Sequence, residues 1–275
     1  MKGFTVLTCF ILLFSVTSCN KFAQVQKSKN VEYQLTKADE YYAKKKYRYA
    51  QQLYEQLFPV YKGNQKFEEL YYKYAYCFFY LEMYRDAENL FKGYLEVFPT
   101  SARAEEVDYM RAYSFFKQSP KIELEQVNTQ KALQMMQTFI STHPGSKRIK
   151  DASDIIDIAR KKLETKEHRA AKLYYDMGNF RASALAFTAI MNNYPESLKG
   201  EEYKLMVVKS YYKFAKMSIA EKQLERYEKV LTEVEDFTDR YPESTLLKEV
   251  ENYKNLSINN IKELHHEQNT SSVKL

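Results

Sequence analysis

The sequence predicts an all-α fold, a solenoid of about five helix pairs followed by a C-terminal capping helix. Three observations predict it. Apolar and aromatic residues recur at spacings of three and four residues, the period of a helix face, and not at the spacing of two that strands require. Small residues recur among these aromatics through the chain, as in repeat architectures. Prolines follow successive copies of the pattern at positions 59, 99, 144, 195 and 242.

The first 18 residues read as a lipoprotein signal peptide. Lys2 precedes an apolar run, Phe4 to Val16, that is shorter than the roughly 20 residues of a membrane-spanning helix. The run ends in Val16-Thr17-Ser18-Cys19, which resembles the bacterial lipobox, so we expect Cys19 to carry lipid. The alternative is an ordinary signal peptide that contains a cysteine. Asn20 is not the aspartate that retains some lipoproteins in the inner membrane, which favours the outer membrane.

The remaining cysteines exclude a disulfide framework. Cys9 is lost with the signal and Cys19 is lipidated, so Cys77 is left without a partner in the mature chain. Cys77 lies in an aromatic helical pattern, where a cysteine is more often a small buried residue than a reactive thiol. We expect residues 19–30 to be a short lipidated tether.

The second helix pair shows the repeat most clearly. Ala75 is followed by Tyr84 after nine residues, Ala87 after three more, Phe91 after four, and Pro99 closes the pair. These spacings match the tetratricopeptide repeat, a helix–turn–helix of 34 residues. Alanine lets two helices cross closely, aromatics fill the space between neighbouring pairs, and proline stops the second helix.

Four other pairs follow the same order. Pair 1 contains Ala38, Tyr41, Tyr47, Ala50, Tyr54 and Leu57, and its Pro59 falls early. Pair 4 contains Ala171, Tyr174, the turn Gly178-Asn179-Phe180, Ser183, Phe187 and Ile190. Pairs 3 and 5 are longer, and we expect about eight extra residues in the connection between their two helices. Pair 3 contains Ala112, Phe115, Ala132, Met136 and Phe139, and pair 5 contains Ser210, Tyr227, Val230, Val234 and Phe237.

This pattern sets the expected organisation of the chain. Repeats 1–3 occupy residues 31–144, and repeats 4–5 with a capping helix over about 246–265 occupy residues 145–267. The polar tail 268–275 has no periodicity, and we expect it to be disordered. The Pro-Thr-Ser, Pro-Gly-Ser and Pro-Glu-Ser segments place a serine where a helix cap is needed.

No motif indicates catalysis. The four histidines are scattered, Gly145-Ser146-Lys147 lacks the upstream glycine and strand of a phosphate-binding loop, and carboxylates alternate with Lys and Arg as on solvated helix faces. We therefore expect no enzyme activity, no metal site, no cofactor and no nucleic-acid binding.

Aromatic residues on the first helices of repeats 1–3 are more numerous than one interface can bury. In a tetratricopeptide stack these helices line a concave groove, and tyrosine suits peptide binding because it joins a large apolar face to a polar tip. The expected groove residues are Tyr42, Tyr72, Tyr76, Phe79, Tyr80, Tyr109, Tyr113 and Phe116. The alternative is that neighbouring helices cover these rings.

The lipobox, five helix pairs, and lengthened pairs 3 and 5 together resemble the BamD family, lipoproteins of the outer-membrane β-barrel assembly machine. The Pro-x-Ser segments at 99–101, 195–197 and 242–244 are typical of it. Pro59 and the long link between repeats 3 and 4 depart from the pattern. The resemblance covers roughly residues 19–265.

The resemblance implies a lipid-anchored scaffold on the periplasmic side of the outer membrane. Its N-terminal repeats would bind unfolded barrel substrates, and its C-terminal repeats would bind a barrel-forming subunit with periplasmic repeat domains. The alternative is another periplasmic adaptor that serves cell-wall or division proteins.

Overall fold

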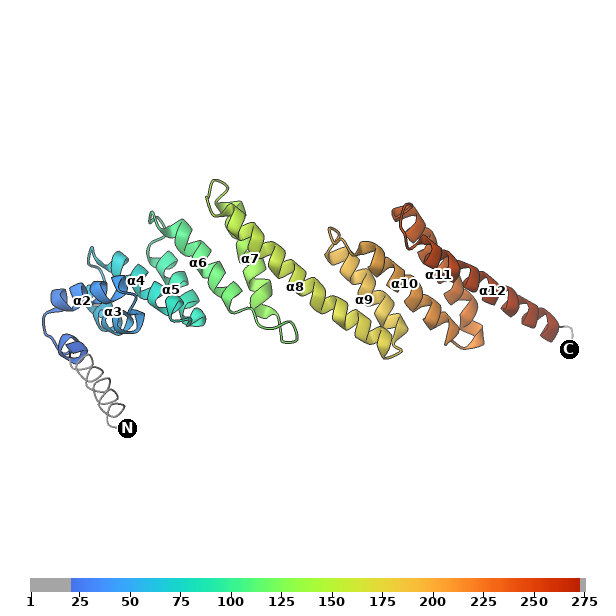
Figure 1. Cartoon of the computed structure of the whole chain (residues 1–275), viewed down its shortest axis with the longest axis horizontal. Helices are drawn as coiled ribbons and strands as arrows, with labels where there is room; N and C mark the ends of the chain where they lie inside the picture. Colours follow the sequence, from blue (N-terminus) through green and yellow to red (C-terminus); the bar gives the residue numbers. More distant parts are fainter. Residues whose placement is uncertain (1–20, 273–275) are drawn as a thin grey trace, which may run out of the picture. The chain divides into compact units, whose positions relative to one another are not determined.

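The computed structural model describes residues 21–272, with side chains up to residue 266, and the described residues form helices and turns without any strand. By its contacts the chain divides into two units, residues 1–159 and 160–275. The first unit holds six whole helices (Figure 1): α2 (Val31–Ala43), α3 (Tyr47–Tyr61), α4 (Phe67–Tyr80), α5 (Tyr84–Val97), α6 (Ala104–Lys117) and α7 (Val127–Thr142). The division falls inside α8 (Ile149–Asp176). The second unit continues with α9 (Phe180–Asn193), α10 (Gly200–Lys216), α11 (Ala220–Arg240) and α12 (Leu247–Ser272).

The small residues of the repeat lie at helix crossings, as the sequence predicts. In each unit consecutive helices pack against one another. The alanines and serines assigned to the repeat have no more than 1% of their surface exposed: Ala38, Ala50, Ala75, Ala87, Ala112, Ala132, Ala171, Ser183 and Ser210. Such positions bring two backbones close together, and the large side chains three and four residues away then fill the layer between pairs.

Four of the five prolines end a helix. Pro99, Pro144, Pro195 and Pro242 each lie two residues beyond the last residue of a repeat's second helix. Pro59 does not, because α3 continues through it to Tyr61. The expectation that every proline closes its pair is therefore wrong for repeat 1.

Each of the four helix-ending prolines is followed by a serine that joins two repeats. The hydroxyl oxygen accepts a hydrogen bond from the backbone N–H two residues later, as in the turn of Ser101 with Arg103 at 3.0 Å. The same hydroxyl donates to a glutamate on the first helix of the preceding repeat, or on α8. The pairs are Ser101 with Glu68, Ser146 with Glu105, Ser197 with Glu164 and Ser244 with Glu201. The serine thus ends one repeat and fixes the start of the next.

Repeats 3 and 5 are lengthened in different ways. In repeat 3 the connection between α6 and α7 is longer, residues 118–126, as expected. In repeat 5 the connection is residues 217–219, as short as that of repeat 2, and the extra length lies in the helices. There α11 has 21 residues, against 14 in α5. The predicted insertion in that connection is wrong because the helical pattern simply continues for further turns.

Two segments differ from the organisation expected. The long link after repeat 3 is helical, and Ala152, Ile155 and Ile156 in its α8 belong to the core of the first unit. The boundary between the two units therefore lies between residues 159 and 160, further along the chain than the expected boundary at residue 145. At the other end, α12 extends to Ser272, into the segment 268–275 expected to be disordered.

The described chain begins with helical residues that pack against repeat 1. Phe22 and Val25 are buried, and the ring of Phe22 lies 4.5 Å from that of Tyr49 and 5.8 Å from that of Tyr41. The Gln34 amide donates hydrogen bonds to the carbonyls of Val25 and Gln26. Residues 21–26 were expected to be part of a tether, and the structure shows them docked. The expected signal peptide, residues 1–18, and the expected lipidation site Cys19 lie outside the described residues.

Among the described residues, no helix combines the length and the apolar character that crossing a membrane requires.

Candidate peptide-binding surface

The eight aromatic residues expected to form a groove belong to α2, α4 and α6, the first helices of repeats 1–3. The structure brings them into a continuous row of ring contacts. Tyr42 contacts Tyr80 with ring centroids 6.4 Å apart, Tyr80 contacts Tyr76 at 5.7 Å, and Tyr76 contacts Tyr72 at 4.6 Å. The row therefore joins α2 to α4 through side chains alone.

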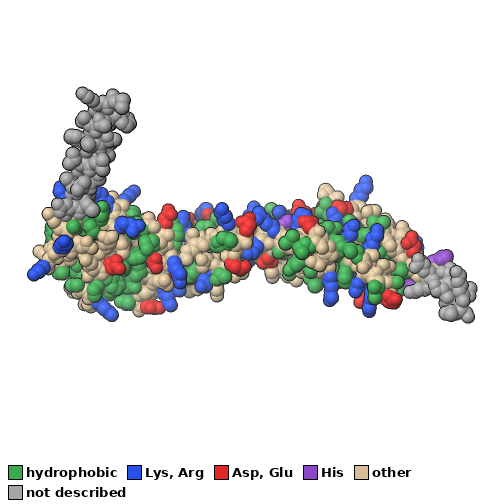
Figure 2. Space-filling model, turned by 90° about the horizontal axis from the view of Figure 1, so that it is seen from below, with side chains coloured by type: hydrophobic (Ala, Val, Ile, Leu, Met, Phe, Trp, Pro, Cys, Tyr) green, Lys and Arg blue, Asp and Glu red, His purple; other side chains and the backbone are tan. Residues whose placement is uncertain are grey.

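The same row continues from α4 to α6. Phe79 lies 5.7 Å from Tyr113, and Tyr113 stacks on Phe116 at 5.9 Å and on Tyr109 at 5.8 Å, with ring planes within 21° of each other. We call the eight residues the aromatic row. Figure 2 shows one face of this first unit, on which hydrophobic side chains, tyrosines included, cover a broad area.

Exposure differs sharply along the row. Tyr80 is exposed over 46% of its surface, and Tyr42, Tyr72, Phe79, Tyr113 and Phe116 are partly exposed. Tyr76 and Tyr109 are only 5% exposed. Neighbouring helices thus cover two rings of the row and leave six at least partly accessible, and peptide binding by those six stays a prediction.

The two buried tyrosines are held by polar partners. The Tyr76 hydroxyl donates to the Glu106 carboxylate at 2.8 Å, and burial raises the pKa of Tyr76 above its ordinary value. Tyr109 packs edge-on against Phe139, beneath the Arg148 guanidinium, and burial raises its pKa to about 12. Both rings belong to the interface between repeats and are not available to a peptide.

One further residue belongs to the accessible part of the row. Tyr47, the first residue of α3, stacks on Tyr80 at 4.4 Å with ring planes 21° apart. In the sequence, Tyr47 belongs to the repeat pattern of a second helix, which lies away from a groove. Its place in the α2–α3 turn brings it to the row, and no spacing in the sequence indicates this.

Charged groups beside the row are paired with one another. Lys73 on α4 lies 2.9 Å from Asp39 on α2 and 3.1 Å from Glu69. Glu69 in turn pairs with Arg103, whose guanidinium lies 4.5 Å from the ring of Tyr72. Around Tyr72 the surface therefore offers a ligand aromatic faces and tyrosine hydroxyls, beside charges that are paired within the protein.

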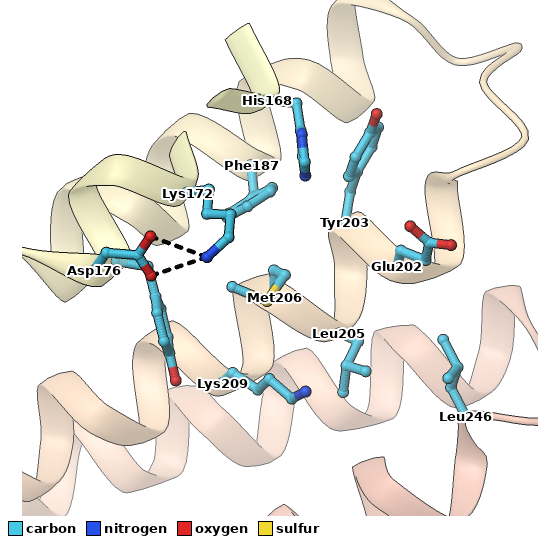
Figure 3. A pocket seen from close by; sticks show the side chains of 11 residues that line it. His168, Lys172, Asp176, Phe187, Glu202, Tyr203, Leu205, Met206, Lys209 and Leu246 are labelled. Carbon is cyan, nitrogen blue, oxygen red and sulfur yellow. Dashed lines mark hydrogen bonds and ion pairs between the residues drawn. The ribbon is translucent and has the colours of Figure 1, made fainter. Parts of the chain in front are cut away.

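The second unit contains a pocket of about 460 Å³ that sequence reasoning missed. It is lined by residues of α8, α9 and α10 and by Leu246 just before α12: His168, Lys172, Tyr175, Asp176, Phe187, Glu202, Tyr203, Leu205, Met206 and Lys209 (Figure 3). His168 lies between the rings of Phe187 and Tyr203, at 5.9 and 5.6 Å, and burial lowers its pKa.

Both lysines that line this pocket are paired within the protein. Lys172 pairs with Asp176 at 2.9 Å, and Lys209 pairs with Glu249 at 2.6 Å. What remains is an apolar floor that includes Met206, suited to a side chain from a partner. The sequence could have indicated this pocket, because its lining residues on α8 and α10 belong to the first helices of repeats 4 and 5, which correspond to the helices that carry the aromatic row.

The described part of the chain has no cluster of metal-ligating side chains, and its cysteine is buried. Residues 21–266 contain no group of three or more His, Cys, Asp or Glu side chains placed to hold a metal ion. Cys77 is fully buried, as expected, and burial raises the pKa of its thiol, so the thiolate is disfavoured.

Comparison with known families agrees with the architecture. Residues 26–223 match the YfiO family, described as outer membrane lipoproteins. The chain belongs to the YfiO family. This is the BamD family that the repeats and the lipobox resemble, and the match covers repeats 1–4 and part of repeat 5.

Similar solved structures are tetratricopeptide proteins of low sequence identity. The TPR2AB domain of yeast Sti1, in its pHSP90 complex, is 11% identical, with a TM-score of 0.39, over 82% of this chain and 98% of that one. A putative kinesin light chain of Podospora anserina, with nearly identical TPR-like repeats, is 11% identical, with a TM-score of 0.33, over 78% of this chain and 97% of that one. No curated protein matches this YfiO family member in sequence.

Proposed function

We propose that this YfiO family protein is a lipid-anchored scaffold and receptor of the outer-membrane β-barrel assembly machine. It binds the barrel-forming subunit and unfolded barrel substrates, and it faces the periplasm. Membership of an outer membrane lipoprotein family supports the location, and the lipobox ending at Cys19 supports the anchor. Helix-pair solenoids present extended binding surfaces, which suits a scaffold rather than a catalyst.

The aromatic row is the observation that carries the substrate part of this proposal. Six of its rings are accessible, and Tyr47 adds a seventh, spread over three successive repeats. An extended chain with alternating aromatic side chains, such as the last strand of a barrel, could stack on these rings along its length. Rigid tyrosines lose little conformational entropy on binding, so each contact retains most of its favourable free energy.

A photo-crosslinking experiment tests the aromatic row. Changing Tyr80 and Phe116 to Ala removes one ring from α4 and one from α6 without opening the core, because both rings are accessible. We expect crosslinking to a peptide with a barrel protein's C-terminal sequence to fall at least about tenfold, since each stacked ring contributes about 0.5–1.5 kcal/mol beyond its buried area.

The matched control is Tyr174→Ala, which removes a ring of similar exposure, 43%, from α8. Tyr76 and Tyr109 are left intact because their loss would disturb the contact between repeats. Crosslinking that is unchanged in the double variant, or equally reduced in the control, would contradict the proposed peptide site.

The function itself is tested by recovering partners from detergent-solubilised envelopes with a C-terminally tagged full-length chain, identified by mass spectrometry. The proposal expects a large outer-membrane barrel protein with periplasmic repeat domains, in amounts near those of the tagged chain. Recovery of division proteins or cell-wall hydrolases without that barrel would instead support the alternative adaptor function. Palmitate labelling that is lost in Cys19→Ala would establish the lipid anchor in the same cells.

A further inference from the structure

The net positive charge of the chain is concentrated in residues 21–48, which run from the docked N-terminal residues to the first turn of α3. Residues 21–48 contain eight Lys and Arg residues and three Asp and Glu residues, a net charge of +5. Residues 49–275 contain 33 of each kind and are neutral, and residues 1–20 add only Lys2 to reach the total of +6. A mature chain that begins at Cys19 would therefore carry its whole excess of positive charge within 28 residues.

The three acidic residues among residues 21–48 already form ion pairs with lysines. Each forms an ion pair: Glu32 with Lys66 at 2.7 Å, Asp39 with Lys73 at 2.9 Å, and Glu40 with Lys37 at 2.9 Å. Lys44 makes only a marginal contact with Glu40, at 3.9 Å. The remaining cations of residues 21–48 have no acidic partner within ion-pair distance among the described residues.

Most of these free cations gather at one place. Lys44, Lys45, Lys46 and Arg48 are exposed in and beside the turn between α2 and α3. Lys21 is brought to the same turn, because its neighbour Phe22 packs on the rings at either side of the turn. We call these five residues the basic turn. Figure 2 shows Lys and Arg side chains projecting at this N-terminal end of the first unit.

The docked residues 21–26 also fix the distance between the basic turn and the expected lipid. Only Asn20 separates Cys19 from Lys21 in the chain, so their Cα atoms are at most about 7 Å apart. A long flexible tether would let the repeats move freely below a membrane. Burial of Phe22 and Val25 against repeat 1 prevents this and keeps the basic turn within reach of the headgroup layer.

We propose that the basic turn binds the headgroups of anionic phospholipids in the membrane that holds the lipid of Cys19. This inference rests on the lipid anchor included in the proposed function. Lys and Arg beside an anionic surface are attracted to it, and an acyl chain joined to a basic patch is a stable pair of membrane signals. Repeat 1 then lies against the membrane, with the aromatic row starting directly beside it at Tyr42 and Tyr47.

The test measures vesicle binding without the lipid, so that only the protein surface contributes. The mature chain, residues 19–275 with Cys19→Ser, is sedimented with phosphatidylcholine vesicles and with vesicles that also contain phosphatidylglycerol. We expect binding to the anionic vesicles only, with an affinity that falls as salt is raised. Changing Lys44, Lys45 and Lys46 to Gln should weaken it about a hundredfold.

The matched control changes Lys213, Lys216 and Lys248 to Gln, which removes the same charge from exposed positions of the second unit. Full binding by this control, with loss in the first variant, supports the basic turn. Equal loss in both variants, or equal binding to both kinds of vesicle, overturns the inference. The envelope pull-down does not depend on this result, so the proposed scaffold function can succeed or fail separately.

Discussion

At the scale of single residues, the surplus of tyrosine has two explanations that depend on burial. Several tyrosines are buried rings whose hydroxyl donates to a carboxylate: Tyr54 to Asp39, Tyr76 to Glu106, Tyr94 to Glu68, Tyr194 to Glu167 and Tyr203 to Glu164. A buried hydroxyl without a partner would cost free energy, so each ring needs its acid. Other tyrosines, such as Tyr80, are exposed and left for a ligand. Spacing alone does not separate these two groups.

The close packing of the Tyr71 ring against Gly93 predicts the effect of replacing that glycine by alanine. A Cβ atom on Gly93 would lie 2.2 Å from the Tyr71 hydroxyl oxygen. Tyr71 is buried between Phe58, at 4.7 Å, and Tyr94, at 5.8 Å, so the ring has little room to move aside. We expect Gly93→Ala to lower the free energy of unfolding by about 1–3 kcal/mol, measured by urea denaturation.

Gly145→Ala provides the control for this prediction. A Cβ atom at Gly145 would meet nothing within 4 Å, so that substitution should leave stability nearly unchanged. Equal stability of the two variants would show that the Tyr71 ring can be displaced without cost.

At the scale of helices, α10 and α11 are joined by a buried cluster of charges. Lys204 is 3% exposed and pairs with both Glu233 and Asp236, and Lys229 binds Glu233 at 2.6 Å. Burial alone would raise the pKa of Glu233, but hydrogen bonds from Lys204 and Lys229 outweigh it and hold the pKa below the ordinary 4.5. The cluster therefore joins the two long helices of repeat 5 through ion pairs between α10 and α11.

This cluster predicts a pH-dependent stability. Because the pKa of Glu233 is lowered in the folded chain, its stabilising effect is present above about pH 4.5 and is lost as the pH falls through the folded value. Lys204→Met should lower the free energy of unfolding by about 1–2 kcal/mol at pH 7, since it leaves the half-buried Glu233 carboxylate less well compensated. Urea denaturation at pH 7 and pH 4 should show a smaller difference between variant and wild type at the lower pH.

The control is Lys248→Met, at an exposed position of α12. It should follow the wild type at both pH values. Parallel pH profiles for Lys204→Met and the wild type would mean that the cluster contributes nothing to the acid sensitivity.

At the scale of the whole molecule, the chain has two separately packed cores, each with its own candidate binding surface. The aromatic row belongs to the core of the first unit, and the pocket around His168 belongs to the second unit. We propose that the aromatic row serves unfolded substrate. Since the family resemblance assigns the barrel-forming subunit to the C-terminal repeats, we propose that the pocket serves that subunit. Residues of the two surfaces do not share a repeat, so changes at one surface should leave the other folded.

Because the pocket and the aromatic row are separate surfaces, a substitution in one should abolish its own binding activity and leave that of the other intact. Met206→Glu places a charge at the floor of the pocket, and it should remove the barrel subunit from an envelope pull-down while peptide crosslinking stays normal. Met217→Glu, at a residue 71% exposed and outside the pocket, is the control. Joint loss of both activities in Met206→Glu, or retention of the barrel subunit, would place the subunit's binding site elsewhere.

Much of the architecture follows from the sequence by itself. Helical periodicity and the small residues at crossings determine the fold class, the number of pairs and the helix ends at Pro99, Pro144, Pro195 and Pro242, because these depend on contacts within one repeat or between adjacent ones. Family membership follows for the same reason, since the order and length of the repeats are written along the chain.

Tertiary structure alone decided which side chains are covered. It buried Tyr76 and Tyr109, added Tyr47 to the aromatic row, docked Phe22 on repeat 1 and formed the pocket around His168. Exposure depends on which neighbouring helix or turn crosses a given position, and such crossings join residues far apart in sequence. Periodicity names the face on which a residue lies, but only the packed chain shows what lies against that face.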